Sequence, residues 1–151
     1  PHAPSDNARL NAAFGRCSLI HLQRDDTLNQ AISLLRAEQT GLWHRNADGS
    51  ELEREAPRRE AGYDRAAISA HIDRISQQNR EWAAWFKEEG LRPLHLSYEK
   101  LSSAPGHELA RVFAHIGLDP AHAENVSTQT SRLADDVSAN WRARYLAEDR
   151  L

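Results

Sequence analysis

The chain has 151 residues, 40% of them hydrophobic and 27% charged, with a formal net charge of −3 and a single cysteine. A chain of this length predicts one domain that buries about two thirds of its unfolded surface, and no apolar run reaches the roughly 18 residues of a membrane span. The negative charge disfavours nucleic acid as a partner, and the lone Cys17 excludes an internal disulfide and a cysteine-rich zinc site, so we expect a soluble protein of a reducing cytoplasm.

The N-terminal residues predict a short helix followed by a buried strand. Residues 6–14 place Leu10 and Phe14 on one helical face, with Asp6 as a candidate cap. The next apolar run, CSLIHL at residues 17–22, is longer than simple alternation allows. Such a run predicts a strand that is covered on both faces in a parallel sheet.

A second helix is predicted after a short charged turn. Apolar residues recur at helical spacing from Asp26 onward, and Thr40-Gly41 closes the run. These apolar residues are Leu28, Ala31, Ile32 and Leu35. The order strand, tight turn, helix is the first half of a parallel α/β unit.

The segment from residue 44 to residue 62 differs in composition from its surroundings. It is charged, contains two glycines and a proline, and shows no apolar period. This pattern predicts a long and mobile loop, and long loops in compact domains are often lids or binding segments. A solvated insertion without function fits the pattern equally well.

The remaining residues predict three helices and one strand. A long helix begins at Tyr63 and ends at Gly90, and its apolar stripe consists of Ile68, Ile72, Ile75, Trp82 and Phe86. A strand is predicted at residues 93–97 and a helix at residues 107–115, followed by an amphipathic helix in SANWRARYLAE. The inward residues of the helix at 107–115 are expected to be Leu109, Val112, Phe113 and Ile116.

Strands that alternate with helices predict an α/β fold with a parallel sheet and right-handed crossover connections. Two strands are too few for a parallel sheet with both faces covered. We therefore expect further strands to come from residues before Pro1 or from another chain.

Arg24 is the most promising binding residue because it follows the first predicted strand. Open α/β sheets bind ligands at the carboxyl ends of their strands, and Ser33 lies nine residues further, in the next helix. A guanidinium fork and a hydroxyl can hold one dianion from two directions. The alternative is a surface salt bridge from Arg24 to Asp25 or Asp26.

Three blocks of the sequence resemble a known family. The order Arg24, Asp26, Gln30-Ala31, Ser33, Gln39-Thr40-Gly41 and Trp43 resembles the signature of the bacterial trehalose 2-sulfotransferase family. LSYEKLSSAPGHELARVFAHIGL resembles the tyrosine-glutamate-x-leucine block that is found across sulfotransferases. SRLADDVSANWRARYL is similar to the family's C-terminal arginine loop and tryptophan helix, so the resemblance extends from Asp6 to Tyr145.

This resemblance implies a carbohydrate sulfotransferase. Such an enzyme transfers a sulfuryl group from 3'-phosphoadenosine 5'-phosphosulfate, without a metal, to a hydroxyl of a carbohydrate such as trehalose or a glycolipid. The resemblance implies that Arg24 and Ser33 hold the 3'-phosphate, that Tyr98 lies near the adenine, and that Arg132 reaches the same phosphate. The alternatives are a backbone-bonded Ser33, a Tyr98 that only packs in the core, and a solvated Arg132. Glu99 is interpreted as a structural acid that holds its loop.

The chain departs from the family pattern at the phosphosulfate loop. Sulfotransferases hold the 5'-phosphosulfate in a loop of serine, threonine and glycine between the first strand and the first helix. No such loop follows a predicted strand here, and the family's general base lies upstream of anything that matches Pro1. The resemblance therefore implies the C-terminal part of a P-loop-like sulfotransferase fold, with no catalytic residue of its own and inactive alone. Family analogy favours a homodimer.

Two other functions fit the same sequence. A phosphotransferase of the nucleotide-kinase type shares the parallel sheet and the arginines around phosphates, but it requires magnesium. A non-catalytic helical interaction module would use Trp82, Trp85 and Phe86 as its contact surface. His21 and His95 fall within the predicted strands and are interpreted as core or edge residues rather than as bases.

Overall fold

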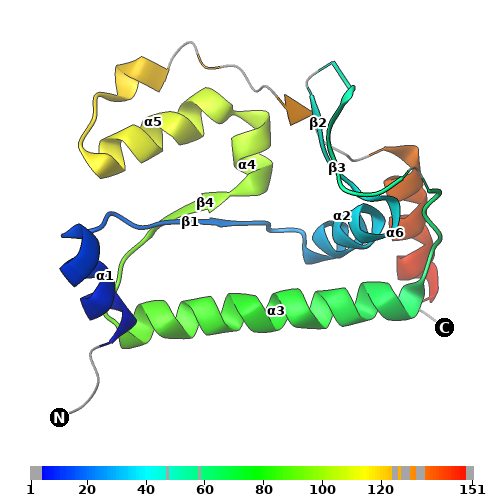
Figure 1. Cartoon of the computed structure of the whole chain (residues 1–151), viewed down its shortest axis with the longest axis horizontal. Coiled ribbons are helices and arrows are strands. Elements are labelled where there is room, and N and C mark those ends of the chain that lie inside the picture. The colour runs from blue at the N-terminus through cyan, green and yellow to red at the C-terminus, as the bar shows by residue number, and fades with distance from the viewer. Residues whose placement is uncertain are drawn as a thin grey trace. The chain divides into compact units, whose positions relative to one another are not determined.

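The computed structural model places the helices and strands shown in Figure 1. It describes residues 5–46, 48–57, 59–123, 126, 130, 131 and 135–148, with residues 45, 130 and 131 described through their backbone alone. The chain divides into two compact units, each assembled from two separate stretches. The first unit comprises residues 1–25 and 79–127, and the second comprises residues 26–78 and 128–151.

Both units contain helices and strands. The first unit contains α1 (Asp6–Phe14), β1 (Ile20–Gln23), β4 (Leu94–Ser97), α4 (Tyr98–Ser103), α5 (Pro105–Ile116) and the 3-10 helix η1 (Pro120–Ala123). The second contains α2 (Thr27–Thr40), β2 (Leu42–Asn46), β3 (Glu51–Arg54), β5 (Thr130–Ser131) and α6 (Asp136–Glu148). The long helix α3 (Arg65–Glu88) runs from the second unit into the first.

The sheet of the first unit is a parallel pair, β1 and β4, in which Ile20 is opposite Leu94 and Gln23 is opposite Ser97. This confirms the predicted mixed α/β character with a parallel sheet. The first strand begins at Ile20 rather than at Cys17. Its predicted burial on both faces is wrong within the described chain, because Ile20 is 43% exposed and Leu22 is 49% exposed. Ile20 and Leu22 share one face of β1, and among the described residues it is the opposite face, which carries His21, that packs against Phe86 of α3.

The second unit holds a three-stranded antiparallel sheet in the order β3-β2-β5, which the sequence did not predict. Two of its strands fall in or next to the segment 44–62, so the expectation of an irregular loop is wrong for residues 44–46 and 51–54. The tight turn between these strands contains Gly49, which has a φ of 84°. A positive φ of this kind is readily adopted by glycine.

Helix α2 forms where the sequence predicted it, between two well-defined ends. The carboxylate of Asp26 caps its N-terminus by accepting the backbone N–H of Asn29 at 2.9 Å. Gly41 ends the helix with a φ of 68°, and a Cβ at this position would lie 2.6 Å from the Cβ of Ala56. Gly41 is therefore required twice, for its backbone conformation and for the close approach of residue 56.

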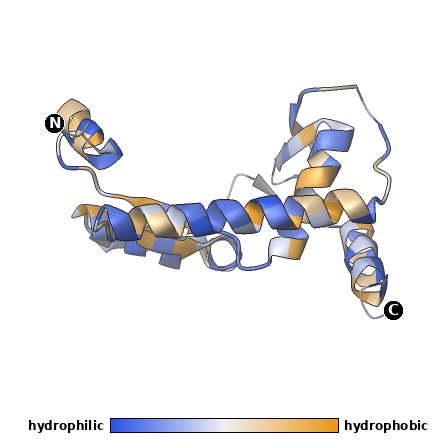
Figure 2. Cartoon of the chain, turned by 90° about the horizontal axis from the view of Figure 1, so that it is seen from below, coloured by the Kyte–Doolittle hydropathy of each residue, from blue (hydrophilic) through white to orange (hydrophobic). Residues whose placement is uncertain are grey.

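The main hydrophobic core belongs to the second unit. It is formed by one face each of α2, α3 and α6, and it consists of Ala31, Ile32, Leu35, Ile68, Ile75 and Trp141. Figure 2 shows that hydrophilic and hydrophobic residues alternate along α3, as expected for a helix with one buried stripe. The predicted inward positions of Ile32, Leu35, Ile68 and Ile75 are confirmed.

The first unit buries fewer apolar side chains, and several predictions fail there. Phe14 is exposed, and α1 buries no residue at all. The cap of α1 is Ser5 rather than Asp6. Trp82 is half exposed, and Ile116 is exposed because it is the last residue of α5, directly before Gly117. For Phe14, Trp82 and Ile116, helical spacing identified an apolar face of the helix, but too few neighbouring side chains cover these residues to bury them.

Candidate functional site

Arg24 follows β1 directly, at the carboxyl end of the parallel pair. Its side chain is half-buried, and its Nε lies 3.4 Å from Oε1 of Glu99. Its guanidinium carbon lies 4.5 Å from the centre of the Tyr98 ring. The ion-pair partner of Arg24 among the described residues is therefore Glu99 of α4, and neither Asp25 nor Asp26 takes that place.

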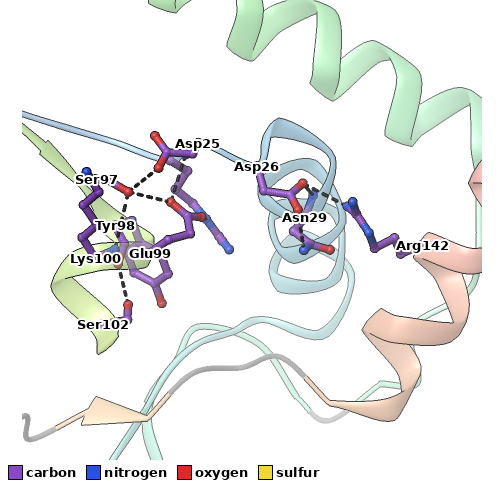
Figure 3. A network of polar contacts seen from close by, with 10 residues as sticks. Asp25, Asp26, Asn29, Ser97, Tyr98, Glu99, Lys100, Ser102 and Arg142 are labelled. Carbon is purple, nitrogen blue, oxygen red and sulfur yellow. Dashed lines mark hydrogen bonds and ion pairs between the residues drawn. The ribbon is translucent and has the colours of Figure 1, made fainter. Parts of the chain in front are cut away.

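Glu99 ties the ends of the two parallel strands together. Its Oε2 accepts the backbone N–H of Asp25 at 2.9 Å and lies 3.3 Å from the hydroxyl of Ser97. The Ser97 hydroxyl donates to Oδ2 of Asp25 at 2.5 Å and also accepts the Lys100 N–H that caps α4. Figure 3 shows Ser97, Glu99 and Asp25 gathered around this hydroxyl. The contacts fix the backbone immediately after Arg24.

The electrostatics of this cluster keep Glu99 ionised. Burial raises the pKa of Glu99, but the N–H of Asp25 and the guanidinium of Arg24 lower it more, so the pKa lies below its ordinary value. The charged carboxylate faces Nε of Arg24. In the part of the chain that the structure describes, the two terminal nitrogens of Arg24 make no hydrogen bond, so they remain available to an anion.

Of the four predicted binding residues, the structure brings Arg24 and Tyr98 together. Ser33 lies on α2 in the second unit, where it is half-buried. Its hydroxyl makes no hydrogen bond to another described residue, whereas Thr40 on the same helix bonds back to the carbonyl of Arg36 at 2.7 Å. Arg132 lies outside the described residues. A shared phosphate for Arg24 and Ser33 stays a prediction.

A separate polar cluster in the second unit was missed by sequence reasoning. Oδ1 of Asp26 lies 3.0 Å from Nη1 of Arg142 on α6, and Oδ2 accepts the side-chain amide of Asn29 at 2.9 Å (Figure 3). The spacing of Asp26 and Asn29 is readable as a helix cap. The contact between Asp26 and Arg142 could not be predicted from the sequence, because the two residues are 116 positions apart.

His21 and His95 lie opposite each other in the parallel pair. Their Nδ1 atoms are 3.3 Å apart, and the His21 ring packs against Phe86 with 5.1 Å between ring centres. Burial lowers the pKa of His21 from its ordinary value, and the neighbouring His95 lowers it further. The His21 imidazole therefore resists protonation in the folded chain.

We expect this pair to make the folded protein less stable in acid. Because the pKa of His21 is lower in the folded state, the unfolded chain binds the proton first, and the free energy of unfolding falls as the pH drops below about 6.5. Urea denaturation at several pH values between about 7.5 and about 5.5 measures this slope. His21→Gln should flatten the slope and His95→Gln should flatten it in part, whereas an unchanged slope in His21→Gln would contradict the assignment.

The described residues contain neither a candidate membrane-spanning helix nor a candidate metal cluster. No helix in this part of the chain is both long enough and apolar enough to span a bilayer. Among the same residues, no three histidine, cysteine, aspartate or glutamate side chains are grouped as metal ligands would be.

A family model and two curated relatives place this chain in the same family. A family model described as Stf0 sulphotransferase matches residues 1–148. Trehalose 2-sulfotransferase of Mycobacterium tuberculosis (strain ATCC 35801 / TMC 107 / Erdman) is 34% identical over 131 residues, which cover 85% of this chain and 45% of that protein. Trehalose 2-sulfotransferase of Mycolicibacterium smegmatis (strain ATCC 700084 / mc(2)155) is 33% identical over 127 residues, 84% of this chain and 45% of that protein. The chain thus spans about half the length of the curated relatives it matches.

Proposed function

Because this chain belongs to the Stf0 sulphotransferase family, we propose that it is part of a carbohydrate sulfotransferase that uses 3'-phosphoadenosine 5'-phosphosulfate. Both relatives are named for trehalose, so the acceptor we propose is a hydroxyl of trehalose or of a related glycoside or glycolipid. In this reaction the acceptor oxygen forms a bond to sulfur while the bond from sulfur to the 5'-phosphate breaks. The hydroxyl proton passes to a base, and adenosine 3',5'-bisphosphate leaves.

The observation that carries this proposal is the environment of Arg24. A donor with two phosphate groups needs cationic and hydrogen-bonding groups that are already in position, since such a reaction depends on placement and charge stabilisation. Arg24 stands at the carboxyl end of a parallel strand, and its terminal nitrogens make no hydrogen bond to any described residue. We propose that Arg24, Ser33 and Arg132 bind the 3'-phosphate. We propose Tyr98 for the same site, and the contact of its ring with the Arg24 guanidinium supports this.

We assign no catalytic base within the described residues. The groups that hold the 5'-phosphosulfate and remove the acceptor proton are proposed to lie in the part of the relatives that this chain does not match. We also propose that this part completes a P-loop-like sulfotransferase fold. The present chain alone is then expected to have no sulfotransferase activity. A cytoplasmic location and a homodimer are further proposals.

The test is a calorimetric titration of adenosine 3',5'-bisphosphate into this chain without magnesium. Arg24→Ala is expected to weaken binding about ten- to a hundredfold, because it removes charge-assisted hydrogen bonds to the phosphate. The matched control is Arg9→Ala, since Arg9 is an exposed arginine of α1 paired with Asp6. Equal affinity in wild type and Arg24→Ala would contradict the proposed phosphate site.

The same titration separates the competing functions. Binding that appears only with magnesium would favour a phosphotransferase of the nucleotide-kinase type. No nucleotide binding under either condition would favour an interaction module. An observation that suits such a module is the aromatic cluster of α3, where Trp82 stacks on Phe86 with 5.7 Å between ring centres and Trp82 is half exposed.

A further inference from the structure

We infer that Tyr98 and Glu99 are positioning residues for Arg24, and that Tyr98 acts on the nucleotide through Arg24 rather than as a platform for the adenine. This inference rests on the proposed function, because it assumes that Arg24 binds the 3'-phosphate. It assigns Tyr98 a different role from the one that the family resemblance implies. The geometry of the three side chains carries it.

Glu99 holds the Nε end of the guanidinium. Its Oε1 lies 3.4 Å from Nε, and its Oε2 accepts the backbone N–H of the next residue, Asp25. One carboxylate therefore fixes both the side chain of Arg24 and the backbone immediately after it. Glu99 is itself held in place, because it belongs to the first turn of the capped helix α4. A long arginine side chain loses substantial conformational entropy when it binds an anion, and an anchor at Nε removes part of that loss beforehand.

Tyr98 covers one face of the same guanidinium. A separation of 4.5 Å between the guanidinium carbon and the ring centre is within the range of a favourable cation–π contact. The ring and the carboxylate restrain the guanidinium in different ways. Tyr98 limits the tilt of the guanidinium plane, and Glu99 limits rotation about the side-chain bonds of Arg24. Among the described residues, the edge that carries the two terminal nitrogens is left for a bidentate contact with a phosphate.

This arrangement has a consequence for the nucleobase. The ring face that lies against Arg24 cannot stack on an adenine while the guanidinium stays in place. Moving Arg24 away to admit the base would also break its contact with Glu99. The face of Tyr98 that covers Arg24 can therefore support the 3'-phosphate without touching the base, and the effect of Tyr98 should depend on whether Arg24 and the 3'-phosphate are both present.

A double-mutant cycle with two nucleotides tests this dependence. Adenosine 3',5'-bisphosphate and adenosine 5'-phosphate, which lacks the 3'-phosphate, are titrated into wild type, Tyr98→Leu, Arg24→Ala and the double variant. We expect Tyr98→Leu to weaken binding of the bisphosphate about two- to fivefold, to leave adenosine 5'-phosphate unchanged, and to add no further loss when Arg24 is already alanine. Tyr98→Phe keeps the ring and should bind as wild type does.

The other outcomes of the titrations separate failure of this inference from failure of the proposed function. Equal losses for both nucleotides, or a loss that persists in the Arg24→Ala background, would show a direct contact with the base and overturn the inference while leaving the proposed function intact. No binding of the bisphosphate to wild type would overturn both. A second measurement needs neither ligand nor a folded Tyr98→Leu variant. The Nε–H proton resonance of Arg24 should carry a ring-current shift in wild type and in Tyr98→Phe. Its absence from both would also overturn the inference.

Discussion

Replacing Ile32 by alanine is expected to lower the free energy of unfolding by about 2–5 kcal/mol. Ile32 is fully buried on α2, in a cluster with Leu35, Ile68 and Trp141. The substitution removes apolar contacts and leaves a cavity, because three helices hold the walls of this core and cannot all move inward. The effect should be among the largest that one deletion of apolar atoms produces in this chain.

Urea denaturation followed by tryptophan fluorescence measures this effect, since Trp141 lies in the same core. Ile32→Val removes one methylene group and should cost about 0.5–1.5 kcal/mol. Leu52→Ala is the matched exposed control, because Leu52 is 54% exposed on β3, and it should change stability by less than about 0.5 kcal/mol. If Ile32→Ala and Leu52→Ala were equally stable, the core would be assigned wrongly.

The helices could be predicted from the sequence because their signals are local. Apolar residues at helical spacing identified α2 and α3, and Gly41 identified the end of α2. The antiparallel hairpin of β2 and β3 could not be identified in this way. Its strands read LWHRN and ELER, with little apolar alternation, and they are supported by polar pairs such as Arg54 with Glu51 and His44 with Glu53. Pattern reasoning interprets such a charged stretch as a loop.

The candidate site shows the same division between local and distant information. The position of Arg24 after a strand was readable, and so was the helix that carries Ser33. The partner of Arg24 could not be predicted, because Glu99 is 75 residues away and the adjacent Asp25 and Asp26 were the expected partners. The pairing follows from the parallel register of β1 and β4, which places Gln23 opposite Ser97 and so brings the residues after each strand together. Long-range register of this kind is a property of the folded chain.

Replacing Arg111 by leucine is expected to destabilise the first unit by about 2–4 kcal/mol. The main cause is the buried carboxylate of Glu108, which loses its cationic partner, rather than lost packing. Glu108 is only 2% exposed, and its Oε2 accepts a hydrogen bond from Nη1 of Arg111, one turn further along α5. Arg111 also donates from Nη2 to the carbonyl of His95 at 3.1 Å, which ties α5 to β4. Without Arg111, the partner of the buried Glu108 carboxylate among the described residues is His107, whose Nδ1 lies 3.2 Å from Oε1.

A double variant separates the two causes. If the unpaired charge dominates, Glu108→Leu combined with Arg111→Leu should recover much of the stability that Arg111→Leu loses, since an apolar pair can replace a buried ion pair at little cost. If the bond to the His95 carbonyl dominates, the double variant should be as unstable as Arg111→Leu. Thermal unfolding of the two variants and of wild type at neutral pH decides between them, and a fully stable Arg111→Leu would show that Glu108 is satisfied without its arginine.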